Sequence, residues 1–366
     1  MSVFDADLRL TWRTCIRWFL FKAVSILYGG LNSLWRWSYV MGFKKGTAVK
    51  TTVISVGNIT VGGTGKTPMI DWLLGFCKQE GLITAVLSRG YKAKRKANLQ
   101  ILDAQTAASG SSENFGDEPW FLFHNHPDSK FYISPNRVLA AQQAEKNSDV
   151  ILLDDGMQHL KLERNLNLVL VDAVAGFGNQ KLLPLGPLRE PLQCLERADV
   201  ILYTKTNLRD SSWIRSKVRP FLRQATQEFD CQFLPLSLLS SLGKSEVTLQ
   251  TIKGERCLLI SGIGNPKGFE ETILGEGAVV VDHLILEDHQ KYDVATIRKL
   301  NQFIEQHSYQ WLLCTEKDWT KLEAWKHHLP EFFRVKMMMQ PEDSFYQYMR
   351  SFFQSDSLHQ SQYRPN

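Results

Sequence analysis

The six cysteines of this 366-residue chain form no metal-binding pattern. No two of them make a CxxC pair, and no histidine stands near them at the spacing of a zinc ligand. This scattered distribution argues against a zinc site and is typical of buried thiols in a reducing compartment. The cysteines are Cys15, Cys77, Cys194, Cys231, Cys257 and Cys314.

A long apolar run, a signal-peptide cleavage site, internal repeats and low-complexity tracts are also missing. The first apolar stretch, residues 18–28, is interrupted by Lys22 and ended by Gly29-Gly30, so it is shorter than the roughly 20 residues that cross a bilayer. No small-residue cleavage site follows it, which argues against secretion. Hydrophobic residues at 43% and charged residues at 22% predict a folded protein. The length predicts two domains or one enlarged α/β unit.

Positive charge is concentrated near the start of the chain. Residues 1–50 contain eight Lys or Arg against two Asp, a local charge of +6 where the whole chain has +5. Trp12, Trp18, Trp35 and Trp37 lie among these basic residues and suit a membrane interface. We therefore interpret residues 12–40 as a monotopic helix or helical hairpin, within a membrane-associated segment 1–42. The alternative is a terminal helix that packs on the core with some aromatics exposed.

Short apolar runs alternate with helical stretches from residue 52 onward. Strands separated by helices usually pair in parallel, so this order predicts an α/β fold of the P-loop NTPase-like kind, with a mainly parallel sheet and helices on both faces. A later alternation predicts a second, smaller α/β domain. We place the P-loop domain at 43–225 and the smaller domain at 226–339, with residues from about 340 to 366 packing back on the first. The expected strands are 52–56, 83–88, 131–134, 150–153, 168–172, 200–204, 257–261, 278–283 and 311–315, with a helix at 68–78 and a mobile loop at 92–114.

The strongest motif stands between a predicted strand and a predicted helix. It reads Thr60-Val61-Gly62-Gly63-Thr64-Gly65-Lys66-Thr67. Its glycines leave backbone N–H groups free to point at phosphates, Lys66 neutralises the β and γ oxygens, and the Thr67 hydroxyl can bind Mg²⁺. Thr60 replaces the first Gly of the usual GxxxxGK[ST] pattern. The strand–turn–helix setting still predicts nucleotide binding.

A second motif is the apolar run 150–153 that ends in Asp154-Asp155. A carboxylate at the carboxyl end of a buried strand can hold Mg²⁺ or its waters, as a Walker B aspartate does. The simpler interpretation is an aspartate that caps the next turn. The neighbouring P-loop motif favours the Mg²⁺ interpretation.

Two charged pairs remain, the acidic pair Asp117-Glu118 before Pro119 and the mixed pair Arg189-Glu190 before Pro191. Phosphoryl transfer to an alcohol needs a carboxylate to accept the hydroxyl proton and benefits from an Arg that stabilises the transferring charge. The simpler interpretation of Asp-Glu-Pro is a helix N-terminus, where acids suit the dipole and Pro suits the first turn. Composition alone does not single out His289.

Together these pieces resemble the tetraacyldisaccharide 4′-kinase family. Eight segments occur in the family's order: 55–68, 88–91, 116–119, 154–159, 182–191, 262–266, 288–289 and 315–318. The resemblance implies transfer of the γ-phosphate of ATP, with Mg²⁺, to the 4′-hydroxyl of a tetraacyldisaccharide 1-phosphate. It also implies two α/β domains with the active site in the cleft between them, at the cytoplasmic face of the inner membrane. The expected partners are the glycolipid substrate and the membrane surface.

By this resemblance Asp117 would be the catalytic base, with Glu118 in the same acidic pair. His289 would orient or tune Asp117 after domain closure. The sequence departs from the family pattern only in residues that shape loops: Met157 where Phe is usual, Lys92 where Gly is common, and Gln180-Lys181 in place of Gly-Arg.

The resemblance also assigns the groups around the phosphates. Asp154, Asp155 and Glu190 would organise Mg²⁺ and its waters, and Arg189 would contact phosphate. Gln158 and His159 would support the site.

Three rival functions fit less well. A membrane-anchored ATPase switch of the MinD/ParA type carries a signature Lys just before the paired glycines, where this chain has Val61. A non-catalytic scaffold predicts the loss of Lys66 or of the charged pairs, and all are present. A nucleic-acid binder is not expected, because the basic residues lie among apolar ones and form no separate stripe. No obligate protein partner is evident.

Overall fold

The computed structural model describes residues 12–90, 93–94, 97–243, 246–287, 290 and 292–360. The strands are β1 (Thr52–Gly57), β2 (Thr84–Ser88), β3 (Gln100–Leu102), β4 (Lys130–Ile133), β5 (Val150–Asp154), β6 (Leu166–Asp172), β7 (Val200–Thr204), β8 (Gln227–Ser240), β9 (Glu246–Thr248), β10 (Arg256–Ser261), β11 (Val279–Ile285), β12 (Trp311–Thr315) and β13 (Phe333–Pro341). The α-helices are α1 (Trp12–Val40), α2 (Lys66–Gln79), α3 (Ala104–Ala107), α4 (Ser112–Phe115), α5 (Asp117–Asn125), α6 (Arg137–Ala144), α7 (Ser212–Val218), α8 (Pro266–Gly275), α9 (Val294–Glu305), α10 (Glu316–Leu322) and α11 (Asp343–Gln360). Short 3-10 helices lie at Leu192–Arg197, Arg219–Phe221, Leu249–Ile252 and Glu323–His328.

One sheet runs through the molecule in the order β11-β10-β12-β13-β8-β7-β6-β1-β5-β2-β4-β3, with β9 paired to β8. The strands from β7 to β4 pair in parallel, and so do those from β11 to β13. The predicted fold class is therefore confirmed. Each predicted strand is present, with ends that fall within two residues of the expected positions.

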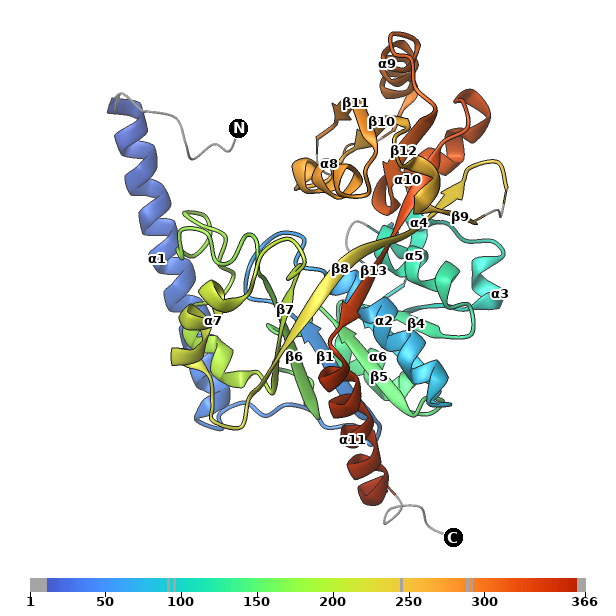
Figure 1. Ribbon diagram of the computed structural model, residues 1–366. Coiled ribbons are helices and arrows are strands. Elements are labelled where there is room, and N and C mark those ends of the chain that lie inside the picture. The colour runs from blue at the N-terminus through green and yellow to red at the C-terminus, as the bar shows by residue number, and fades with distance from the viewer. Residues whose placement is uncertain are drawn as a thin grey trace.

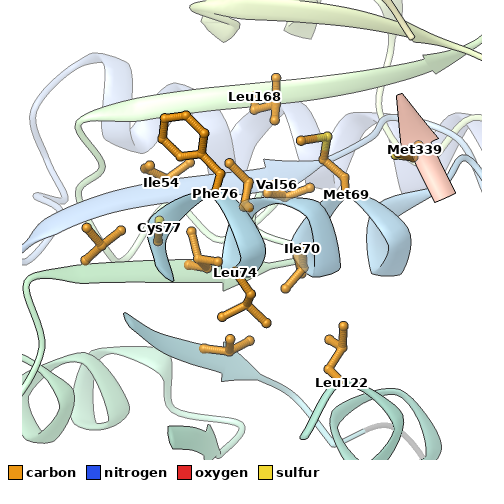
Figure 2. Close-up of a cluster of buried hydrophobic side chains, with 14 of the residues drawn as sticks. Ile54, Val56, Met69, Ile70, Leu74, Phe76, Cys77, Leu122, Leu168 and Met339 are labelled. Carbon is orange, nitrogen blue, oxygen red and sulfur yellow. The ribbon is translucent and has the colours of Figure 1, made fainter. Parts of the chain in front are cut away.

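Alternate residues of β1 face two different cores, because successive side chains of a strand point to opposite faces. Ile54 and Val56 pack with α2, and Figure 2 shows them beneath Met69 and Phe76, beside Leu168 of β6. Val53 belongs to the core on the other face, which α6 covers through its alanines. Helices on both faces explain why β1, β5 and β6 are buried along their whole length.

Two long antiparallel strands, β8 and β13, join the two halves of the molecule. In Figure 1 they run from the larger lobe, built around β1, to the smaller lobe of β10–β12 with α8, α9 and α10. The sequence prediction missed both strands. β8 contains Pro235 at an irregularity of the register, and its exposed and buried residues do not alternate regularly. The predicted domain boundaries at 226 and 339 stay a prediction, since β8 and β13 belong to one sheet with both halves.

The helix α11 follows β13 back onto the larger lobe. Phe345 packs against Trp72 of α2, Tyr346 packs against Phe76, and Arg350 pairs with Glu80. The helix α11 therefore covers α2 on one face of the larger lobe.

The predicted loop at 92–114 is wrong in part, because β3, α3 and α4 lie within it. Asp103 begins α3 by accepting hydrogen bonds from the backbone N–H of Gln105 and Thr106. The Thr106 hydroxyl in turn accepts from the Asp103 N–H, which completes a capping box. The polar residues Asp103 and Thr106, which had suggested a loop, thus form the start of a helix.

The helix α1 is continuous from Trp12 to Val40, so of the two forms expected, a helix or a helical hairpin, the single helix is present, and Gly29-Gly30 lies inside it. In Figure 1 it stands at the side of the larger lobe. Within the part of the chain that is described, no helix combines the length and apolarity needed to cross a bilayer. The five cysteines with described side chains are buried free thiols, as predicted.

Candidate functional site

The carboxyl ends of β1 and β5 meet at one edge of the sheet. Val56 pairs with Asp154 in the parallel register, so the segment that follows each strand leaves the sheet at the same place. The P-loop 60–67 follows β1, and Asp155 follows β5. Open α/β sheets bind their ligands at this edge.

Glycine conformations shape the P-loop as the motif predicts. Gly62 and Gly65 have φ angles of 111° and 93°, which other residues rarely adopt. The helix α2 then begins at Lys66, two residues earlier than predicted. The Lys66 ammonium lies 3.3 Å from Asn58 Oδ1 and 3.6 Å from Asp155 Oδ1, which brings the P-loop cation to the end of β5.

Asn58 is a site residue that the sequence analysis did not single out. Its fully buried side chain donates to the Thr64 hydroxyl at 2.8 Å and accepts from Lys66. Its carbonyl oxygen accepts from Gln158 at 2.9 Å. A polar residue directly after a buried strand and before the glycines was the available signal.

Asp155 and Arg189 form the charged centre of the site. Arg189 Nη1 lies 2.9 and 2.7 Å from the two carboxylate oxygens of Asp155. Burial would raise the pKa of Asp155, but Lys66 and Arg189 outweigh it and hold the pKa of that carboxyl below its ordinary value. Asp155 is therefore ionised, with a φ of 51° that turns it out of the strand.

Asp154 lies deeper, and burial beside Glu118 and Asp155 raises its pKa to about 7. The Ser88 hydroxyl donates to its Oδ2, whereas Oδ1 is buried without a hydrogen-bond partner among the residues described. An unpartnered carboxylate oxygen beside a second carboxylate and a hydroxyl is the oxygen set that a hard cation prefers. Asp154 therefore fits Mg²⁺. The expected role of the Thr67 hydroxyl at the cation stays a prediction.

The acidic pair Asp117-Glu118 forms the first turn of α5, as the simpler interpretation expected. Part of the Glu118 side chain reaches solvent. Loss of bulk water nevertheless raises the pKa of its carboxyl, with Lys66 opposing the rise and Asp155 adding to it. Lys317 from α10 of the smaller lobe also lowers this pKa, and Asp117 raises it. Charges from both lobes thus meet at the start of α5.

Glu190 is almost fully buried, and its Oε2 accepts hydrogen bonds from Arg197 at 2.7 Å and from Gln158 at 3.2 Å. These partners hold the segment that carries Arg189. A direct role of Glu190 at Mg²⁺ stays a prediction. His289 lies outside the described residues, so its expected approach to Asp117 stays a prediction too.

A hollow of about 410 Å³ adjoins the site. It is lined by Trp35 of α1, Pro135, Asn136 and the turn Gln158, His159, Leu160 and Lys161. Burial and the nearby cations Arg137, Arg164 and Lys161 lower the pKa of His159 to about 4, so its imidazole is neutral at physiological pH. Lys44 lies 3.8 Å from the Trp35 ring centre, which adds positive charge beside the hollow.

The outer side of the P-loop is held by the end of β7. The Thr204 hydroxyl donates to the Thr64 carbonyl oxygen at 3.1 Å, and the Lys205 ammonium donates to the Gly63 carbonyl oxygen at 3.1 Å. Lys205 also pairs with the buried carboxylate of Asp172. The Thr64 carbonyl is buried and needs such a donor, because buried backbone acceptors are rarely left unpaired. The Gly63 carbonyl is exposed, and Lys205 links it to Asp172.

We expect Lys205→Met to raise the KM for ATP about fivefold, because a P-loop carbonyl loses its donor and Asp172 loses its cation. The KM for the acceptor substrate should stay unchanged. Steady-state rates are measured first with the ATP concentration varied and then with the acceptor concentration varied, which gives the two KM values separately. Lys94→Met, which breaks an exposed pair with Glu113, is the matched control. An unchanged KM for ATP would show that the P-loop does not depend on Lys205.

Comparison with known proteins agrees with this geometry. The sequence profile of a family described as Tetraacyldisaccharide-1-P 4'-kinase matches residues 16–354. The Tetraacyldisaccharide 4'-kinase of Syntrophus aciditrophicus is 35% identical over 312 residues, covering 80% of this chain and 82% of the relative. That of Pseudomonas entomophila is 37% identical over 277 residues, covering 75% and 76%. A crystal structure of the "apo" form of LpxK from Aquifex aeolicus in complex with ATP superposes with a TM-score of 0.72 at 27% identity, covering 90% of this chain and 98% of that chain.

Proposed function

The chain belongs to the tetraacyldisaccharide-1-P 4'-kinase family, and on that premise we propose that it transfers the γ-phosphate of ATP to the 4′-hydroxyl of a tetraacyldisaccharide 1-phosphate. The product would be lipid IVA, in lipid A biosynthesis. One observation carries the proposal: Lys66 of the P-loop, the Asp155–Arg189 pair and the acidic start of α5 converge at one edge of the sheet.

In the proposed reaction the bond between the γ-phosphorus and its bridging oxygen breaks, ADP leaves, and a new bond forms to the sugar oxygen. Asp117 accepts the proton of that hydroxyl. Lys66 and Arg189 supply positive charge at the transferring group. When bound, Mg²⁺ would neutralise charge on the phosphates, and Asp154 and Thr67 are the groups that would hold it.

The hollow beside Trp35 supports a glycolipid acceptor. It lies between α1 and the turn that follows Asp155, and its lining combines an aromatic ring with polar side chains, as ligand pockets do. Lys44 and Lys161 beside the Trp35 ring suit an anionic phosphate on the substrate.

The test is transfer of radiolabel from γ-labelled ATP to a tetraacyldisaccharide 1-phosphate in detergent, with and without Mg²⁺. We expect label in the lipid only when Mg²⁺ is present. Release of label solely as inorganic phosphate would instead indicate an ATPase switch and contradict the proposal.

We also propose that α1 rests on the cytoplasmic face of the inner membrane. Its outward side carries Leu27, Leu31 and Leu34, each at least 60% exposed, whereas its inward side is polar. This reverses the usual arrangement of a surface helix, whose apolar side faces the core. The excess of positive charge in residues 1–50 suits anionic lipid headgroups.

We expect the triple variant Leu27→Gln, Leu31→Gln and Leu34→Gln to reduce the vesicle-bound fraction at least about tenfold, because three apolar side chains no longer leave water on binding. Flotation with vesicles containing anionic lipid measures this fraction. The matched control replaces three exposed apolar residues of the smaller lobe, Leu242, Leu274 and Val279, by Gln. Equal flotation of the α1 variant and wild type would contradict the membrane assignment.

A further inference from the structure

The inward face of α1 is joined to the main chain of an active-site residue. The Tyr28 hydroxyl donates to the Arg189 carbonyl oxygen at 2.8 Å, and the Asn32 side-chain amide donates to the same oxygen at 3.1 Å. One carbonyl group thus receives two donors from neighbouring turns of the helix, since residues four apart share a helix face.

Further contacts on either side of this carbonyl also join α1 to residues 182–194, and we call the whole set of contacts the seam. Ser25, which is buried, donates to the Leu182 carbonyl oxygen at 3.0 Å. A Cβ on Gly29 would lie 2.8 Å from Leu182 Cδ1, so glycine allows the helix to approach this closely. Arg36 reaches Cys194 at the far end. The seam therefore fixes α1 along residues 182–194.

Arg189 is held on its other side by the start of the P-loop. Its N–H donates to the Ile59 carbonyl oxygen at 2.7 Å, and the Val61 N–H donates to the Pro187 carbonyl oxygen at 2.7 Å. Both main-chain polar groups of Arg189 are therefore used, the N–H toward the P-loop and the carbonyl toward α1.

The guanidinium of the same residue contacts Asp155, which also faces Lys66. A continuous set of contacts thus leads from α1 through the Arg189 backbone to the charged centre.

We propose that Tyr28 and Asn32 are positioning residues for Arg189, and that through them the membrane-facing helix orients the arginine that stabilises the transferring phosphoryl group. The inference rests on the proposed function. The helix α1 would thus have a part in catalysis that is separate from membrane attachment, because its position sets the position of the Arg189 guanidinium.

The experiment compares wild type, Tyr28→Phe, Asn32→Leu and the double variant in detergent micelles, with radiolabelled ATP and the tetraacyldisaccharide 1-phosphate. Both substitutions keep the size of the side chain and remove its donor. We expect kcat of the double variant to fall about tenfold, with the KM for ATP and the melting temperature close to wild type. Ser38→Ala is the matched control, because that hydroxyl donates only to Trp35 of its own helix among the described contacts.

A second arm repeats the double substitution in an Arg189→Ala background. Since the two donors act through Arg189, their removal should then change kcat by less than about twofold. A general loss of helix docking would lower kcat by the same factor in both backgrounds.

The outcomes are distinct. Wild-type kcat in the double variant, or an equal loss in the Arg189→Ala background, would overturn the positioning role. Absence of lipid labelling by the wild-type enzyme would instead contradict the proposed function.

Discussion

Asp117→Ala is expected to lower phosphoryl transfer about 10³-fold while changing the Kd for ATP less than about twofold. A general base contributes roughly 10²–10⁴-fold, and its loss leaves the P-loop contacts of the nucleotide in place. Asp117 opens α5 beside Glu118, whose pKa responds to both Lys66 and Asp155. Single-turnover labelling of the lipid gives the transfer rate, and equilibrium titration with ATP gives the Kd.

The matched control is Asp103→Ala, which removes another aspartate from a helix start, at α3. It should transfer label at the wild-type rate. If Asp117→Ala keeps most of its turnover while Glu118→Gln loses it, the neighbouring carboxylate is the base and the assignment made from the motif is wrong.

Lys66→Ala is expected to lower kcat/KM for ATP by about 10²–10³-fold, because in the proposed reaction a largely shielded cation at the transferring phosphate is lost. Only 15% of the Lys66 side chain is exposed, and its ammonium lies between Asn58 and Asp155. Unlike Asp117→Ala, this variant should also bind ATP more weakly, because we propose that the lysine already contacts the nucleotide in the ground state.

Lys78→Met serves as the control for Lys66→Ala. Lys78 stands on the same helix, α2, and pairs with Asp128 in an exposed salt bridge, which contributes little. Initial rates with ATP varied compare the variants directly. A near wild-type kcat/KM in the Lys66→Ala enzyme would show that the P-loop lysine has no part in the mechanism.

The features of the site that the sequence pattern indicates have local causes. The P-loop turn depends on Gly62 and Gly65, whose positive φ angles other residues rarely adopt. Asp154 is the last residue of a buried strand and Asp155 follows it, and the apolar run 150–153 predicted that strand. Such signals are contained within about ten neighbouring residues, so the residue order alone carries them.

The parts that were missed depend on distant partners. Lys205 supports the P-loop from 142 residues away, and a lysine after a strand gives no hint of that contact. β8 is paired with β13 about a hundred residues later, and Pro235 within it argues against a strand. The register of two strands this far apart is set only when the lobes have folded.

What this chain dictates through its own residue order is the P-loop, the alternation that makes a parallel sheet, and a basic, tryptophan-rich first helix. Folding alone decides that Tyr28 and Asn32, 161 and 157 residues before Arg189, close on its carbonyl oxygen. The physical reason is the distance along the chain over which each feature is encoded. Backbone conformation and strand burial are encoded by neighbours, whereas a hydrogen bond between distant segments leaves no periodic trace and exists only where the topology brings its two groups together.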